Sequence, residues 1–116
     1  MELPPEYLRG IELFNDGRYF ECHEAWETIW LRATGVEREF LHAMIQIAAA
    51  LLHHERGNGK GAASVYQRAK RRLQSLPPVT MNLDTPAFVK RLEAFFTENA
   101  ETRSPMASLP QIRLHS

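Results

Sequence analysis

A histidine and a glutamate stand four residues apart, at His23 and Glu27, in a stretch whose apolar residues recur at helical spacing. Side chains at positions i and i+4 are neighbours on one face of a helix. Projected at 100° per residue, both fall in the middle of an apolar arc with Tyr19, Trp26 and Ile29. Because an unpaired buried carboxylate costs several kcal/mol, we expect Glu27 to be buried and to have a partner.

An imidazole and a carboxylate at this spacing could both ligate Zn²⁺ or a similar divalent ion. Catalytic zinc usually has three protein ligands, and His53, with His42 as a further candidate, is the expected supplier of the third. The segment is not the zincin motif His-Glu-x-x-His, because Glu27 stands where that motif has its second histidine. The alternative is a buried hydrogen-bonded pair that fixes how two helices meet, and the sequence favours this structural interpretation.

Three further residues are candidates for lining a pocket beside this pair. Gln46 and His53 share an inward stripe of the next long helix. Together with His23 and Glu27 they form either one polar pocket or separate core groups, each hydrogen-bonded locally. Trp30 continues the apolar arc. Glu24 lies at the edge of the arc, where it either joins Glu27 as an acid/base pair or reaches solvent or an arginine.

Basic residues gather in the segment after residue 59. They are Lys60, Arg68, Lys70, Arg71 and Arg72. Such a run is either a phosphate-binding face or a solvated helix surface. The equal numbers of positive and negative residues in the whole chain favour the solvated surface. Lys and Arg number 14, Asp and Glu number 14, and the formal net charge is zero. Neither nucleic acid nor an anionic membrane surface is therefore an expected partner.

The elements that would position these residues are all helical. Proline starts, glycine-containing links and apolar periodicity predict an all-α domain of five helices, arranged as antiparallel hairpins with tetratricopeptide-like packing. The third helix is almost entirely apolar between Phe40 and Leu52 and is expected to be the buried centre. The five helices are expected at about 5–14, 18–33, 36–56, 60–76 and 86–100.

Domain organisation follows from the length of 116 residues, which is typical of one domain. We expect a single helical domain over residues 1–100. Residues 101–116 carry prolines and serines and are expected to form an extended tail, ordered only if Leu109, Ile112 and Leu114 dock on the domain.

The single cysteine, Cys22, lies on the apolar arc and is expected to be a core residue. One cysteine excludes an internal disulfide and fits a reducing cytoplasm. The first residues lack a basic region followed by an apolar run, so no signal peptide is expected. No apolar stretch approaches about 20 residues, and no membrane span is expected.

Two runs carry a resemblance to a known family. From Leu13 to Trp30 the chain reads L-F-N-x-G-x-Y-F-E-x-H-E-x-W-E-x-x-W. From Ile45 to Ala62 it has I-Q-x-A-A-A, then His53, then R-G-N-x-x-G-A. Over about residues 11–76 the chain resembles domain of unknown function 309, an all-helical family without an established activity. The resemblance implies a role in metal binding for the His-x3-Glu-x2-Trp motif at His23, Glu27 and Trp30.

Two functions are consistent with the sequence, and neither is established as enzymatic. The first is binding of a metal ion such as zinc, or of a small ligand, at His23, Glu27 and His53. The second is a non-catalytic helical module that binds a protein partner or a second copy of itself, in which the polar residues are structural. Substrate, metal identity and oligomeric state are not specified by the sequence.

Overall fold

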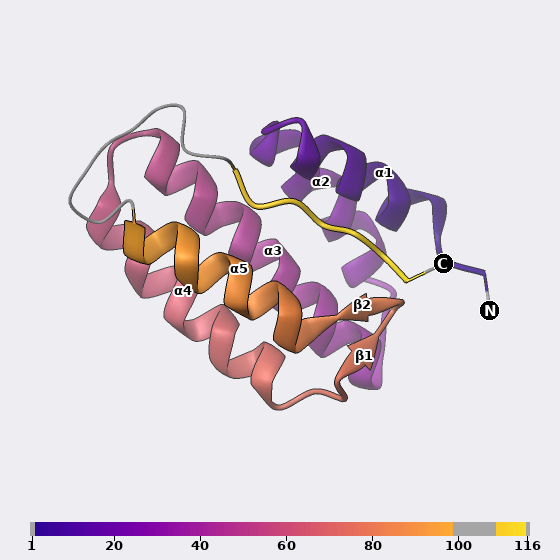
Figure 1. The fold of residues 1–116 in the computed structure, drawn as a ribbon. Coiled ribbons are helices and arrows are strands. Elements are labelled where there is room, and N and C mark those ends of the chain that lie inside the picture. The colour runs from indigo at the N-terminus through magenta and orange to yellow at the C-terminus, as the bar shows by residue number, and fades with distance from the viewer. Residues whose placement is uncertain (1, 99–108, 116) are drawn as a thin grey trace.

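The computed structural model describes residues 2–98 and 109–115, which form five helices and one two-stranded hairpin (Figure 1). The elements are α1 (Pro5–Asn15), α2 (Tyr19–Trp30), α3 (Gly35–Glu55), α4 (Gly59–Gln74), β1 (Val79–Thr80), β2 (Leu83–Asp84) and α5 (Thr85–Glu98). The predicted all-α class with five helices is confirmed. The helix bounds agree with the predicted ones to within three residues at each end.

Helices α1 and α2 form the first antiparallel hairpin. Pro5 occupies the first position of α1, where the missing proline N–H is not needed. Gly17 adopts φ +77°, the left-handed conformation that lets the chain leave α1 and turn directly into α2. The two helices approach closely at Gly10, where only a hydrogen atom separates the α1 backbone from the indole of Trp26.

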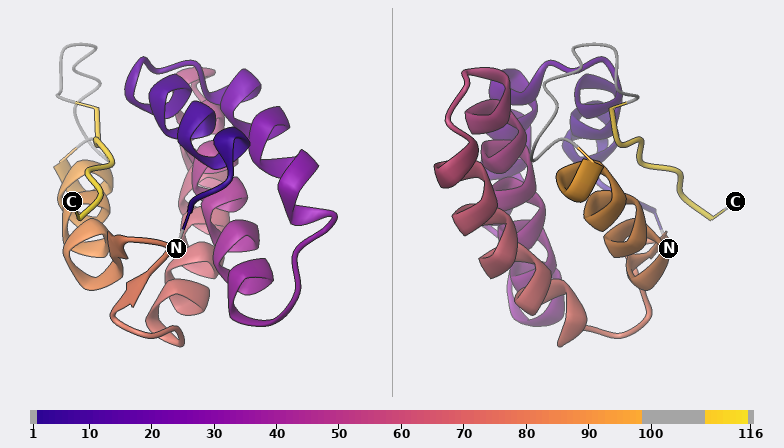
Figure 2. Two further views of the ribbon diagram at one scale, coloured as in Figure 1. Left: turned by 90° about the vertical axis from the view of Figure 1, so that its right-hand side faces the viewer. Right: turned by 60° about the vertical axis from the view of Figure 1, so that its left-hand side comes forward.

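Helix α3 is the central element, packed against α2 on one side and α4 on the other (Figures 1 and 2). Ala43, Met44 and Ile47 are fully buried, and Ile45 is 9% exposed. The buried residues of α3 number nine and all lie between Phe40 and Leu51, inside the apolar stretch that was expected to be buried. One stripe is only half-buried, and it includes His42, Gln46, Ala49 and His53.

Helix α5 packs beside α4 through stacked rings of Tyr66 and Phe96, whose centroids are 4.6 Å apart. The short hairpin that precedes α5 was not predicted, because no strand was expected between the helices at 60–76 and 86–100. Its two turn residues, Met81 and Asn82, both have positive φ, at 48° and 64°, as a two-residue hairpin of the primed type requires. Asp84 caps α5 by accepting a hydrogen bond from Ala87 N at 3.0 Å.

Of the expected tail over residues 101–116, residues 109–115 are described, and they run as an extended segment between α1 and α5 (Figures 1 and 2). Ile112 is 3% exposed, so the segment is docked on the domain. The rest of the expected tail, residues 101–108 and 116, lies outside the described residues.

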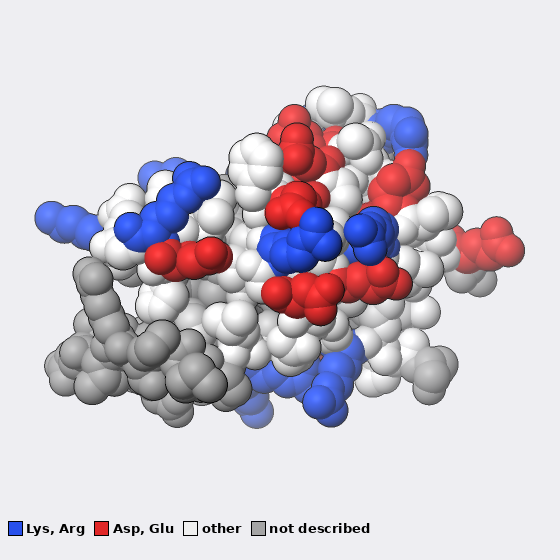
Figure 3. Space-filling model, turned by 90° about the horizontal axis from the view of Figure 1, so that it is seen from above, with Lys and Arg blue, Asp and Glu red and all other residues white. Residues whose placement is uncertain are grey.

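Charges of both signs are interspersed on the face seen in Figure 3, in keeping with a chain of zero formal net charge. Within the described ranges, none of the helices combines the length and the apolarity that crossing a membrane would demand.

Candidate functional site

His23 and Glu27 are neighbours, as their spacing predicted, but neither is buried. The His23 side chain is 34% exposed and that of Glu27 is 50% exposed. Their Nδ1 and Oε2 atoms are 3.7 Å apart, which is an ion-pair distance when the imidazole is protonated and too long for a hydrogen bond. The expectation that Glu27 is buried was wrong.

The error lies in the width assigned to the apolar arc of α2. The residues that reach the core are Tyr19, Cys22, Trp26 and Ile29, with exposed fractions of 0–4%. His23 and Glu27 come one position later around the helix and therefore lie at the rim of this face. Trp30, which is half-buried, made the arc look wider in projection than the packed surface is.

His53 is not brought together with this pair as a third ligand. It lies in the last turn of α3, where its Nδ1 is 3.2 Å from the Asn58 amide nitrogen. Among the residues that the structure describes, no three His, Cys, Asp or Glu side chains are grouped as a metal would require. The pair alone supplies two ligands, fewer than the three of a catalytic zinc site, so metal binding at His23, Glu27 and His53 stays a prediction.

Trp30, the last residue of α2, is held by two side chains of α3. The Arg38 guanidinium lies 4.4 Å from the centre of its ring, a cation–π contact. Arg38 also donates to the Trp30 carbonyl at 2.9 Å, so a positive charge meets the carboxyl end of α2, as the helix dipole favours. The ring of His42 lies 5.5 Å from the Trp30 ring. Burial lowers the pKa of His42 below its usual range, and the neighbouring charge of Arg72 lowers it further.

A groove of about 380 Å³ lies between α3 and α4. Its lining residues are Glu39, Gln46, Arg68, Arg71, Arg72 and Ser75. Three guanidinium groups face one carboxylate there, whereas the chain as a whole is neutral. Arg72 is paired with Glu39 at 2.7 Å. Arg68 and Arg71 are exposed and have no ion-pair partner among the described residues.

Gln46 lines this groove, but its amide oxygen is buried. Its Oε1 atom is buried and has no hydrogen-bond partner among the described residues, a condition it shares with Trp30 Nε1 and Tyr19 OH. Buried polar atoms are normally paired. Gln46 was expected to line a pocket, and the pocket it lines is on the α4 side of α3.

The other expected pocket residues are distributed differently. Trp30 adjoins the groove only through His42, whose neighbour Arg72 belongs to the lining. Glu24 is exposed and is not part of the lining. The arginines of α4 were predicted to form either a phosphate-binding face or a solvated helix surface, and the second alternative was favoured. Their signal was the basic run in the sequence, at i, i+3 and i+4 spacing, which puts Arg68, Arg71 and Arg72 on one helix face.

The groove can bind an anion through geometry that arginine favours. Planar guanidinium groups donate two parallel hydrogen bonds to a carboxylate or phosphate. Of the Gln46 amide, only the Nε2 group can donate to an anion, because Oε1 is an acceptor.

Comparison with known proteins agrees with this architecture. A family model described as "Domain of unknown function (DUF309)" matches residues 7–65. The chain is 36% identical over 74 residues to the uncharacterized protein YpuF of Bacillus subtilis (strain 168), a match that spans 62% of this chain and 42% of that protein.

A solved structure is also similar. It is the crystal structure of a conserved hypothetical protein, TTHA0068 from Thermus thermophilus, with a TM-score of 0.71 and 33% identity. The match covers 82% of this chain and 99% of that one. With a family model over half of its length and a relative of matching fold, the chain belongs to the DUF309 family, whose function is unassigned.

Proposed function

We propose that this protein binds a small ligand with a phosphate or carboxylate group in the groove between α3 and α4. The observation that carries the proposal is the concentration of Arg68, Arg71 and Arg72 in one groove of a neutral chain. A volume of about 380 Å³ is within the range of small-molecule sites. A reducing cytoplasm suits the single buried Cys22 and is the proposed location.

The division of work among the three arginines follows from their contacts. Arg72 is held by Glu39 and keeps one guanidinium oriented toward the groove. Arg68 and Arg71 have no such partner among the described residues and are free to close on an anion. Because the protein around them is neutral, the attraction is local and decreases as salt is raised.

The test is a titration of ¹⁵N-labelled protein with pyrophosphate, followed by amide chemical shifts at low ionic strength. Saturable shifts are expected at α3 and α4 near Gln46 and Ser75. The variant with Arg68→Gln and Arg71→Gln should bind at least tenfold more weakly. Lys90→Gln removes one exposed charge on α5 and should leave the affinity unchanged. Unsaturable shifts, or equal weakening in the two variants, would refute the proposal.

A second variant tests whether pyrophosphate affinity depends on a neutral residue of the groove as well as on charge. Gln46→Met keeps the volume and removes the unpaired amide atom, so folding should be unaffected or slightly more stable. Pyrophosphate binding should weaken because the Nε2 donor is lost, although no charge has changed. An affinity equal to that of the wild type would remove Gln46 from the proposed site.

A second candidate function is association with another protein or a second copy. The extended segment at residues 109–115, which is held by α1 and α5, favours this candidate.

A further inference from the structure

The segment 109–115 is recognised mainly through its backbone. The side chain of Asn15, at the end of α1, accepts a hydrogen bond from Ile112 N at 2.8 Å and donates one to Ile112 O at 3.1 Å. One amide group thus pairs with both polar backbone atoms of one residue, as a neighbouring strand would. This kind of recognition depends on an extended conformation and only weakly on side-chain identity.

Further contacts fix the register of the segment. Gln111 donates to the Asn15 carbonyl at 3.1 Å, and His115 N donates to the carbonyl of Asn82 in the hairpin turn at 2.7 Å. Ile112 is 3% exposed and is the apolar anchor between these polar contacts. These four hydrogen bonds, the buried side chains of Pro110 and Ile112, and Leu114 packed against the core therefore define what this groove accepts.

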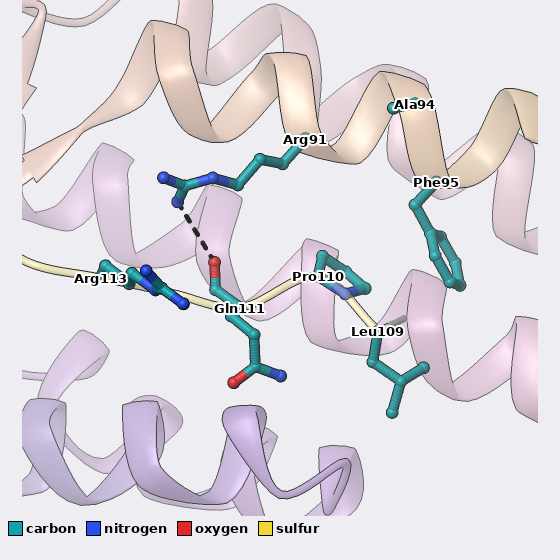
Figure 4. Close-up of a pocket in the computed structure, with 7 residues that line it drawn as sticks. All are labelled: Arg91, Ala94, Phe95, Leu109, Pro110, Gln111 and Arg113. Carbon is teal, nitrogen blue, oxygen red and sulfur yellow. Dashed lines mark hydrogen bonds between the residues drawn. The ribbon is translucent and has the colours of Figure 1, made fainter. Parts of the chain in front are cut away.

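The start of the segment is held less closely than its centre. Figure 4 shows Arg91 and Phe95 of α5 facing Leu109, Gln111 and Arg113 across an open space. The space measures about 470 Å³, and Leu109 is 40% exposed. Arg91 reaches the Gln111 carbonyl only at 3.4 Å. Exposed Leu109 and the long Arg91–Gln111 contact mark this end as the one from which the segment is released on exchange.

We infer that the groove between α1 and α5 also accepts the segment 109–115 of a second copy, so that two chains can exchange these segments. Every copy carries both the groove and the sequence that fits it, and exchange preserves each hydrogen bond and the Ile112 anchor. Reciprocal exchange gives a closed two-fold dimer. The ten residues 99–108 that precede the segment can span at most about 35 Å.

The intramolecular segment competes with the exchanged one. A tethered segment has an effective concentration in the millimolar range. The wild-type chain is therefore expected to be mainly monomeric at micromolar concentration. Weakening the intramolecular contact in both chains, while leaving one intact groove and one intact segment in the mixture, should favour the exchanged pair.

The experiment mixes two full-length variants. Asn15→Ala removes two hydrogen bonds from the groove and leaves the segment intact. Ile112→Asp puts a charge at the buried anchor of the segment and leaves the groove intact. Mass measured by light scattering after size exclusion should stay near 13.3 kDa for each alone. The equimolar mixture should contain a species of twice that mass, at least tenfold enriched over either variant alone.

The matched control mixes Asn15→Ala with a chain carrying both substitutions, so that no intact groove is present. This mixture should remain monomeric. If it associates as strongly as the test mixture, or if the test mixture stays monomeric up to millimolar concentration, the inference is overturned.

A separate measurement covers the case in which Ile112→Asp fails to fold. A labelled peptide with the sequence of residues 109–115 is titrated with full-length Ile112→Ala and followed by fluorescence anisotropy. Saturable binding is expected, with at least tenfold loss when Asn15→Ala is added to the same chain. Absence of binding, or binding indifferent to Asn15, would refute recognition of the segment in trans.

Discussion

Gly10 is the position at which the first hairpin is most sensitive to one added carbon. A Cβ built there would lie 2.1 Å from Trp26 Nε1 and 2.4 Å from Trp26 Cδ1, far inside van der Waals contact. The ring cannot move aside freely, because Trp26 is fully buried and stacks on Phe14 at 6.0 Å. Its Nε1 also donates to the Tyr7 carbonyl at 3.1 Å in a buried hydrogen bond. Gly10→Ala must therefore displace the indole or separate α1 from α2.

The size of the loss follows from three opposing contributions. Overpacking of a close-packed interior costs about 1–3 kcal/mol. Displacing the indole leaves a buried donor or acceptor unpaired, which costs about 1–3 kcal/mol. Alanine in a helix interior regains about 1 kcal/mol relative to glycine. We expect Gly10→Ala to lower the free energy of unfolding by about 3 kcal/mol.

The assay is equilibrium unfolding in urea, followed by tryptophan fluorescence and by far-ultraviolet circular dichroism. Gly59→Ala is the matched control, because no atom lies within 4 Å of the Cβ it would add at the start of α4. That variant should be unchanged or more stable by up to about 1 kcal/mol. If Gly10→Ala were within about 0.5 kcal/mol of the wild type, the close approach of α1 and Trp26 could not be correct.

Three other predictions concern the central helix and the motif. Ile45→Ala should cost about 2–5 kcal/mol in chemical denaturation, since this side chain is almost fully buried. Glu27→Ala should cost less than about 1 kcal/mol in the same assay, because its pair with His23 is largely solvated; a larger loss would indicate a buried role. His42 has a lowered pKa in the folded state, so the unfolded chain takes up the proton first as pH falls below about 6.5. Wild-type stability should therefore fall between about pH 7 and about pH 5.5 by more than that of His42→Gln, and parallel curves would contradict the burial of this imidazole.

The helices were predictable because local chemistry and tertiary packing agree. Proline at the start of α1, glycine at the end of α1 and the near-continuous apolar run of α3 each have one structural solution. The hairpin before α5 had no such signal. Met81 is a poor residue for positive φ, and its conformation is supported by a distant contact, the hydrogen bond from Tyr7 OH to Met81 O at 3.0 Å.

The site was less predictable because faces of a helix are resolved only to about one residue by hydrophobic projection. That uncertainty is enough to move Glu27 from the core to the rim of α2. The groove depends on which side of α3 receives α4, and this is not encoded in either helix alone. The Asn15 side chain pairs with the backbone of Ile112, 97 positions away in the sequence. The spacing of apolar residues within one helix cannot predict such a contact.

Two tryptophans of the family run from Leu13 to Trp30 connect α2 to its neighbouring helices. Trp26 is fully buried and ties α2 to α1 through the Tyr7 carbonyl. Trp30 ties α2 to α3 through Arg38 and His42.

The second connection reaches the groove. The charges of Arg72 and Glu39 both act on the pKa of His42, in opposite directions. The same two residues form the ion pair that orients one arginine of the groove lining. The aromatic end of the motif is thus one side chain away from the proposed anion-binding groups, whereas His23 and Glu27 lie at a solvated rim. We therefore interpret Trp30 as a packing residue beside the α3–α4 groove, and in the proposed function the residues that contact the ligand are on α3 and α4.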